Sequence, residues 1–588
     1  MTFPVRFWPD AWANAIRPFD KAPVLWLVPC MRKPRIWASL DPFYEHGAIL
    51  GRKVANEGFI RTLLDKDPFE AYHFFLPSQA MATSQGKTLE AAHPALFAAG
   101  KFKILTRREL PDSLRENEYA AFHLSDCIVN PAALARLRNA LARNVFPITS
   151  VTHSLSYADY PARFLRHLWP GTTSRDVIAA TSRAGREAVA GIFRFLREAY
   201  GLSPEAFPAP GLEVVPLGVD PTRRPPAAPG EKAALRARLG LPAEAVVFLV
   251  FGRVSHSSKM DLLPILRAFQ RLLRDEKGLP PLYLILAGWL DEEGAGLARM
   301  LMELAHNIGL PARVVKSPDE ALKHSLFAAS DVFISLPDNP QETFGLTVLE
   351  AMACGLPVIG SRYDGYKDLA VDGETGFLVD VTGPAETGEA DMLGPLMFDN
   401  HLHLLLAQQT APDPVQAAGR IRDLAVNPGL RERMGRAGRE RVLARFTWDA
   451  VIDAHLILWE RLAAAPVPDR QWLRTARHPL EMRYAEVFRG YPSRTFDEAM
   501  PLVWTKTGEA VARNKDFPII YEGVRNVVCE KAVRACLVLA RKPVAAGMLV
   551  EKLVRAESEL DPSGARYHIL WCVKQDFLEP AQGGAGHE

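Results

Sequence analysis

Two successive series of alternating strand and helix patterns, separated by one proline-rich segment, constrain the fold of this chain more than any other feature. In the first series, strand patterns lie at residues 24–28, 36–40, 71–76, 102–105, 119–124, 146–152, 177–180 and 212–216. Helical patterns lie among them at residues 48–64, 132–143 and 183–200. Strands that alternate with helices indicate a parallel sheet with helices on both faces.

The second series begins after residues 221–230, PTRRPPAAPG, which have the composition of a linker. Strand patterns at residues 245–251, 282–287, 313–316 and 332–335 alternate with helical patterns at 262–275, 296–308 and 319–329. We therefore predict an α/β protein with two Rossmann-like lobes facing a cleft, at residues 1–225 and 226–465. Residues 430–463 form the closing helical part of the second lobe, and residues 466–588 form a mainly helical extension.

Composition excludes several classes of protein. The 588 residues carry 70 Lys and Arg against 68 Asp and Glu, so no basic excess favours nucleic-acid binding. The six cysteines form no C-x-x-C pair, which is typical of reduced thiols in a cytoplasmic protein and argues against a zinc site. The first 20 residues lack a signal-peptide pattern, and no apolar run reaches the ~18 residues of a membrane span. Peripheral membrane contact stays open.

The stretch from residue 338 to 360, DNPQETFGLTVLEAMACGLPVIG, predicts a loop, a short helix and a strand. Glu342 and Glu350 bracket the expected start of that helix. Backbone N–H groups in a first helical turn have no acceptor within the helix, and together with the helix dipole they bind anions. Taken alone, however, Glu342 is as well explained as a capping acid, and Glu350 as a solvent-facing helix residue.

Four segments, in this order, resemble retaining glycosyltransferases of family 4 (glycosyltransferase group 1), which have the GT-B fold. Residues 342–355, ETFGLTVLEAMACG, are similar to the family's E-x7-E segment, and PLGVDPTR (216–223) to its interlobe signature. FGRVSHSSK (251–259) resembles the phosphate-binding segment, and YDGYKDLAVDGETGFLVD (363–380) the stretch after the E-x7-E helix. The resemblance covers about residues 36–463. It implies that the first lobe is on the acceptor side and the second binds a nucleotide sugar.

The resemblance also implies roles for charged residues. Negative charge builds up on a leaving diphosphate, and fixed positive groups are the strongest means of stabilising it. Arg253 would bind phosphate oxygens as a planar fork and Lys259 as a point charge. The two residues are separated by one residue more than is usual in the family. Glu350 would accept hydrogen bonds from two ribose hydroxyls of the donor.

Other positions would contact the transferred sugar. The resemblance places Glu342 at its hydroxyl groups, and places His153 beside it, donating to a hydroxyl or to the developing charge. The diphosphate and sugar would be held by the residues at the start of the helix, which are Thr343, Phe344, Gly345, Leu346 and Thr347.

Less specific features complete the predicted cleft. Tyr44, Glu45 and His46, followed by Gly47, match the family's acceptor-side glycine loop only loosely and are either acceptor-site or structural residues. Asp368, with the Asp364-Gly365 pair before it, is interpreted as part of the cleft wall. The D-x-D triplet at residues 65–67 follows a helix rather than a donor-site strand, so no metal is expected. No cofactor is expected either, since the nucleotide sugar is a substrate.

The predicted function is a retaining, metal-independent glycosyltransferase of the hexosyltransferase type (EC 2.4). It would transfer sugar from a UDP- or GDP-sugar to a glycan, lipid-linked or protein acceptor, in the biosynthesis of a bacterial polysaccharide or other glycoconjugate. One alternative is a nucleotide-sugar-sensing scaffold that acts through residues 466–588, and another is a phosphorylase or epimerase on the same fold. The extension itself is either a module for protein or acceptor docking or a helical buttress.

Overall fold

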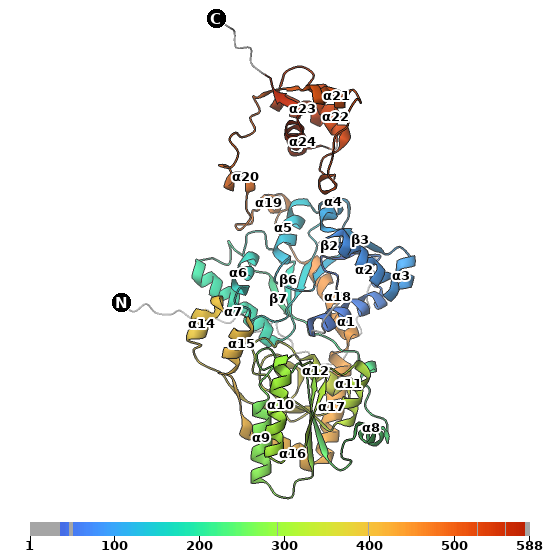
Figure 1. Ribbon diagram of the computed structural model, residues 1–588, viewed down its shortest axis with the longest axis vertical. Helices are drawn as coiled ribbons and strands as arrows, with labels where there is room; N and C mark the ends of the chain where they lie inside the picture. The colour runs from blue at the N-terminus through green and yellow to red at the C-terminus, as the bar shows by residue number, and fades with distance from the viewer. Residues whose placement is uncertain are drawn as a thin grey trace, which may run out of the picture. The chain divides into compact units, whose positions relative to one another are not determined.

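The computed structural model describes residues 36–45, 51–290, 292–397, 399–525, 527–558 and 560–581 (Figure 1). The chain divides into two compact units, and the boundary falls between Leu480 and Glu481. The strand predicted at residues 24–28 lies outside the described residues. Within the described residues, five cysteines are free thiols, and no helix is both long and apolar enough to cross a membrane.

The first lobe contains a seven-stranded sheet in which every pair of neighbours is parallel. Its order is β3-β2-β1-β4-β5-β6-β7, so the order reverses between β1 and β4. The strands are β1 (Ile36–Ser39), β2 (Ala71–Leu76), β3 (Phe102–Thr106), β4 (Ala121–Leu124), β5 (Ile148–Val151), β6 (Asp176–Ala180) and β7 (Gly211–Val214). The helices are α1 (Gly51–Lys66), α2 (Gln79–Ala92), α3 (Pro94–Ala98), α4 (Leu110–Glu116), α5 (Pro131–Leu141), α6 (Tyr160–Phe164) and α7 (Arg183–Tyr200).

The second lobe contains a six-stranded parallel sheet in the order β10-β9-β8-β11-β12-β13. Its strands are β8 (Val246–Phe251), β9 (Leu282–Gly288), β10 (Ala312–Lys316), β11 (Val332–Ser335), β12 (Val358–Ser361) and β13 (Gly376–Val379). Its helices are α8 (Glu231–Leu239), α9 (Leu263–Asp275), α10 (Glu292–Asn307), α11 (Glu320–Ala329), α12 (Leu346–Ala353), α13 (Tyr366–Leu369), α16 (Pro414–Val426) and α17 (Pro428–Arg445). The predicted fold class of two Rossmann-like lobes is thereby confirmed.

Helix α18 (Trp448–Ala464) returns to the first lobe and packs against α1, where it is the orange helix among the blue elements of Figure 1. Trp459 donates to the Thr149 hydroxyl of β5 at 2.8 Å. Helix α19 (Arg470–Thr475) follows, and Arg470 donates to the carbonyls of Ala142 and Arg143. The division between the two compact units falls after Leu480, whereas the boundary expected from the sequence lies after residue 465. Helical periodicity shows that a segment is amphipathic but not which surface it covers.

A segment of the second lobe that the sequence analysis did not single out extends towards the first. Strands β14 (Val381–Thr382) and β15 (Ala411–Pro412) pair antiparallel, and between them lie α14 (Glu389–Leu393) and α15 (Asp399–Ala407). Together these elements occupy residues 381–412. His403 of α15 hydrogen-bonds the Ser156 hydroxyl at 2.8 Å. The backbone N–H of Ala158 donates to Asp399 at 3.2 Å. Figure 1 shows α14 and α15 next to α6 and α7.

The second compact unit has its own apolar core, which includes the fully buried Leu502, Leu549 and Ile569. Helices dominate it, as predicted: α20 (Tyr484–Val487), α21 (Lys506–Ala512), α22 (Glu530–Leu539), α23 (Ala546–Ala556) and α24 (Pro562–Lys574). An antiparallel sheet, in the order β17-β16-β18, was not predicted. Its strands, β16 (Pro501–Trp504), β17 (Val544–Ala545) and β18 (Leu578–Pro580), are too short to show an alternating pattern in the sequence.

Candidate functional site

The start of helix α12 is built by unusually close backbone packing. Gly345 precedes the helix with φ +109°, and a Cβ atom there would lie 2.4 Å from the Tyr366 ring. A Cβ atom on Gly365 would lie 2.4 Å from the Thr343 carbonyl oxygen. These two positions therefore require glycine. The Thr347 hydroxyl in the first turn is buried and has no hydrogen-bond partner, although buried polar groups normally have one.

Lys259 and Glu342 form a largely buried ion pair in front of this helix, with their side chains 15% and 16% exposed. Lys259 follows β8 and Glu342 follows β11, two neighbouring strands whose carboxyl ends meet at one edge of the sheet. Burial alone would lower the pKa of Lys259, but the Glu342 carboxylate outweighs it and raises that pKa. Burial alone would raise the pKa of Glu342, but Lys259 outweighs it and lowers that pKa. Both groups are therefore charged at neutral pH.

Arg253 lies in the same loop but in a different environment. It is exposed, and its Nη1 donates to the Ser258 hydroxyl at 3.1 Å. The backbone N–H groups of Lys259 and Met260 both donate to the Ser255 carbonyl, so the loop forms a compact turn. This turn accommodates the additional residue between Arg253 and Lys259 noted in the sequence.

Asp364 is a further acid beside this pair. Its backbone is left-handed, with φ +42°, and its Oδ1 accepts the Tyr366 N–H at 2.9 Å. Its Oδ2 is buried without a partner. Burial and the nearby Glu342 carboxylate raise the pKa of Asp364. The sequence suggested only a wall residue here, because no motif distinguishes a buried acid from a surface one.

Glu350 is held by two cations that the sequence analysis did not identify. Its Oε1 accepts hydrogen bonds from Lys323 at 2.6 Å and from Arg224 at 3.3 Å. Arg224 belongs to the linker between the lobes, and Lys323 belongs to α11. The linker sequence does not show which arginine contacts Glu350, because Arg223 and Arg224 are adjacent and chemically alike.

His153 follows β5 in the first lobe. Its Nε2 lies 2.8 Å from the Ser125 carbonyl oxygen, which can only accept, so Nε2 carries the proton. Burial lowers the pKa of His153 to about 4, so the ring is neutral at physiological pH. Its Nδ1 is then an acceptor, suited to receive a hydrogen bond from a hydroxyl rather than to donate one.

The two lobes contact each other at the start of α12. The Ser182 hydroxyl, which caps α7, also donates to the Thr343 carbonyl at 2.8 Å. The backbone N–H and Nε of Arg183 donate to the Asp368 carboxylate at 2.6 and 2.5 Å. Gln341 donates to the Tyr157 hydroxyl at 2.9 Å. Asp368, interpreted from the sequence as cleft wall, therefore joins the second lobe to the first.

The loosely matched acceptor-side loop is only partly described. Glu45 pairs with Arg52 at 2.8 Å, and the Tyr44 hydroxyl lies 2.9 Å from His93 Nε2. His46 and Gly47 lie outside the described residues.

The D-x-D triplet at residues 65–67 is engaged by neighbouring side chains. The carboxylate of Asp67 pairs with Lys101, and the exposed Asp65 lies 3.4 Å from His93. Among the residues that the structure describes, no group of three or more His, Cys, Asp or Glu side chains could hold a metal ion.

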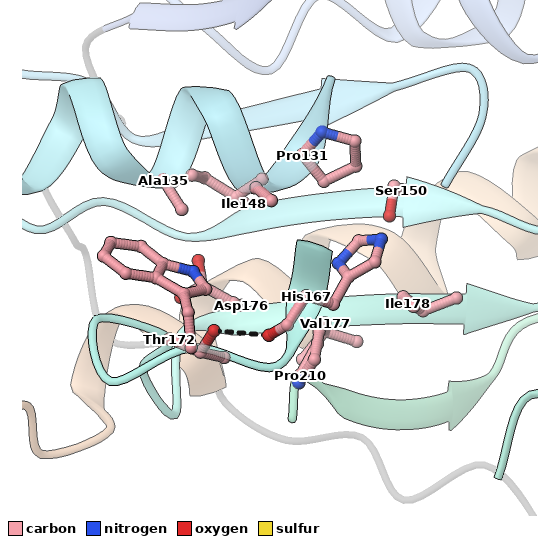
Figure 2. A pocket seen from close by; sticks show the side chains of 12 residues that line it. Pro131, Ala135, Ile148, Ser150, His167, Thr172, Asp176, Val177, Ile178 and Pro210 are labelled. Carbon is pink, nitrogen blue, oxygen red and sulfur yellow. Dashed lines mark hydrogen bonds between the residues drawn. The ribbon is translucent and has the colours of Figure 1, made fainter. Parts of the chain in front are cut away.

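A cavity elsewhere in the first lobe is not part of this site. Figure 2 shows it between α5 and strands β5 and β6, next to a hydrogen bond from the Thr172 hydroxyl to the His167 carbonyl. Its volume of about 10 Å³ is that of roughly one water molecule, far too small for a sugar nucleotide.

Comparison with known proteins bears on the lobe that carries this site. Residues 231–390 match the model of the family described as glycosyl transferases group 1. We call these residues the group 1 domain, after the family whose model they match. The matched residues of this group 1 domain include Lys259, Glu342 and Glu350.

Individual relatives match parts of the chain. A D-inositol 3-phosphate glycosyltransferase of Rhodococcus erythropolis is 36% identical over 188 residues, which are 31% of this chain and 39% of the relative. An enzyme with the same description from Kineococcus radiotolerans is 32% identical over 271 residues, which are 46% of this chain and 54% of the relative. The chain thus spans about two fifths to one half of the length of these two relatives.

Solved structures resemble the chain at low sequence identity. HepE of Anabaena, in complex with UDP and glucose, has a TM-score of 0.48 and 16% identity, covering 74% of this chain and 100% of its own. Sucrose-phosphate synthase of Thermosynechococcus elongatus has a TM-score of 0.45 and 18% identity, with the same coverage. The fold assignment of the group 1 domain and its partner lobe rests on the sheet orders given above.

The raised pKa of the Asp338 carboxyl group predicts that the stability of the group 1 domain depends on pH. The carboxylate accepts the Asp261 N–H at 3.2 Å, and burial, together with the Asp261 carboxylate, raises the pKa of Asp338 to about 7. The unfolded chain releases this proton near pH 4, so folded-state stability decreases between about pH 4 and pH 7. Wild type loses this stability between pH 5 and pH 8, whereas Asp338→Asn has no such proton to lose. We therefore expect the free energy of unfolding of Asp338→Asn, relative to that of wild type, to increase by on the order of 2 kcal/mol between these pH values. Urea denaturation at both pH values measures this difference.

The exposed Asp275→Asn is the matched control, and we expect it to follow the wild-type pH dependence. The same pH dependence in wild type and Asp338→Asn would show that Asp338 does not hold its proton in the folded protein.

Proposed function

We propose that this chain is a retaining glycosyltransferase that uses a UDP- or GDP-sugar and needs no metal ion. The acceptor is a glycan, a lipid-linked glycan or a protein. The observation that carries the proposal is the buried Lys259–Glu342 ion pair in front of the open end of α12. A cation, a carboxylate and a helix N-terminus at one point suit a ligand with both a diphosphate and sugar hydroxyls.

In this proposal, donor binding rearranges the ion pair. The diphosphate replaces Glu342 as the ion-pair partner of Lys259. N–H groups at the start of α12 and the Thr347 hydroxyl donate hydrogen bonds to the diphosphate oxygens. Arg253, exposed at the loop, closes onto the phosphates from the other side. Glu342, released from Lys259, accepts hydrogen bonds from the hydroxyls of the sugar. The Glu350 carboxylate accepts a hydrogen bond from a hydroxyl group of the ribose.

The reaction then proceeds by exchange at the anomeric carbon. The bond from that carbon to the diphosphate oxygen breaks, and a bond to the acceptor oxygen forms on the same face of the sugar. The acceptor proton passes to a phosphate oxygen of the leaving diphosphate. Arg253, Lys259 and the helix end stabilise the negative charge that develops there. His153 accepts a hydrogen bond from a hydroxyl of the sugar through Nδ1 and so orients the ring.

Nucleotide-sugar binding tests the proposal directly. We expect the thermal unfolding temperature of the 588-residue chain to rise when one of a panel of UDP- and GDP-sugars is added. A ligand at 100 times its dissociation constant adds about 2.7 kcal/mol to the unfolding free energy. Product anomers, assigned by nuclear magnetic resonance with the donor so found, show whether the configuration is retained. No stabilisation by any nucleotide sugar, UDP or GDP would contradict the proposed function.

A further inference from the structure

A four-residue charge cluster lies behind the Glu350 end of the site. Arg224 Nη2 donates to Glu320 at 2.5 Å and to Glu350 at 3.3 Å, and Lys323 Nζ donates to Glu350 at 2.6 Å. Lys323 Nζ also lies 3.8 Å from Glu320 and 5.1 Å from the centre of the Phe251 ring. Phe251 ends β8, immediately before the loop that carries Arg253 and Lys259.

The cluster is arranged around one oxygen of Glu350. Both cations donate to Oε1, and the structure shows no hydrogen bond to Oε2 within the described residues. Arg224 is 5% exposed, an unusual burial for an arginine. Its Nε is buried without a partner, but the Glu350 and Glu320 carboxylates outweigh the effect of burial and raise the pKa of Arg224. The adjacent Arg223 is exposed, so within the linker it is Arg224 that turns inward to the Glu350 carboxylate.

We propose that Arg224 and Lys323 are positioning residues for the nucleoside of the donor: they fix the Glu350 carboxylate through Oε1, so that Oε2 accepts a single ribose hydroxyl. This inference rests on the proposed function. It revises the expectation that Glu350 binds two hydroxyls, because one of its oxygens is already occupied.

Two physical effects follow from this arrangement. A carboxylate without partners would rotate and would repel the diphosphate bound about one turn away at the start of α12, whereas two cations hold it still and offset its charge. In addition, Arg224 belongs to the linker between the lobes, so the proposed ribose site is tied directly to the segment that connects them. A purely structural ion-pair network would produce neither a preference for ribose nor any dependence of it on Arg224.

Nucleotide analogues distinguish the two explanations. Isothermal calorimetry of the full-length protein would measure binding of UDP, GDP, their 2′-deoxy and 3′-deoxy analogues, and inorganic pyrophosphate. We expect wild type to prefer the ribonucleotide over one deoxy analogue by at least about tenfold, the value of a hydrogen bond to a charged group. Arg224→Met and Lys323→Met should each reduce this preference to below about threefold. Pyrophosphate binding should stay within about twofold of wild type, since Lys259 and the helix end are unchanged.

Two further variants complete the design. Arg223→Met removes the adjacent linker arginine, which pairs with Asp220 at 3.3 Å, and should keep the full ribose preference. Lys323→Arg keeps a cation at Glu350 and should restore most of the preference lost in Lys323→Met, which separates positioning from misfolding.

Retention of the ribose preference in both methionine variants would overturn the inference while leaving the proposed function intact. Equal loss of pyrophosphate and nucleotide binding in them would also overturn it, because that pattern indicates a general structural role. Failure of the wild-type protein to bind either nucleotide would instead contradict the proposed function itself.

Discussion

Replacing Lys259 by methionine should reduce kcat by about a thousandfold, because it removes the buried cation proposed to stabilise the leaving diphosphate. The same change leaves the Glu342 carboxylate buried without its partner. We therefore also expect the free energy of unfolding to fall by about 3 kcal/mol. Steady-state kinetics with the donor identified by thermal shift, and urea denaturation, measure the two effects.

A double variant separates the two effects. Lys259→Met with Glu342→Gln removes both charges, so it should recover most of the lost stability but none of the lost turnover. Lys277→Met, at an exposed lysine after α9, is the control and should be unchanged in both measurements. Turnover that recovers together with stability would show that Lys259 supports the fold and takes no part in the reaction.

Replacing Arg253 by methionine should have the second-largest effect, a decrease in kcat of about a hundredfold. In contrast to Lys259, Arg253 is exposed and donates one hydrogen bond, to Ser258. The free energy of unfolding should therefore change by less than about 0.5 kcal/mol. Arg253→Lys should recover only part of the activity, since an ammonium group cannot bind two phosphate oxygens as a planar fork.

Arg267→Met on α9 is the matched control, because Arg267 is also exposed and donates to Gln270 at 2.8 Å. We expect wild-type activity from this variant. A decrease in activity equal to that of Arg253→Met would point to a general effect of surface charge on donor binding. Wild-type kcat in Arg253→Met would remove Arg253 from the proposed mechanism.

Elements defined by local pattern were predictable from the sequence. Most strands of the two lobes are short apolar runs bounded by polar segments, and they lie close to the predicted positions, whereas β13 was not predicted as a strand. The meeting of Lys259 and Glu342 was also foreseeable. Both follow strand patterns of one lobe, and carboxyl ends of parallel strands share one edge of a sheet. Local sequence determines such contacts through the geometry of the sheet.

Contacts that depend on long-range packing were not predictable. Arg224 reaches Glu350 across 126 positions of sequence, and nothing in the linker distinguishes it from Arg223. Helix α18 has the pattern of any amphipathic helix, yet its apolar face fits the first lobe. The unpartnered oxygen of Asp364 results from a left-handed residue in a loop, and an aspartate within a loop usually indicates only a turn.

The contacts of Ser182 and Arg183 with Thr343 and Asp368 bear on how such an enzyme can be recombined. Under the proposed function, exchanging the first lobe is the way to give the second lobe a new acceptor. Here the incoming lobe would also have to supply a hydroxyl for the Thr343 carbonyl and a cation for Asp368. A chimera lacking them would leave an unpaired carboxylate and a loosened turn before α12. A graft that works must therefore carry both the serine that caps α7 and the arginine that begins it.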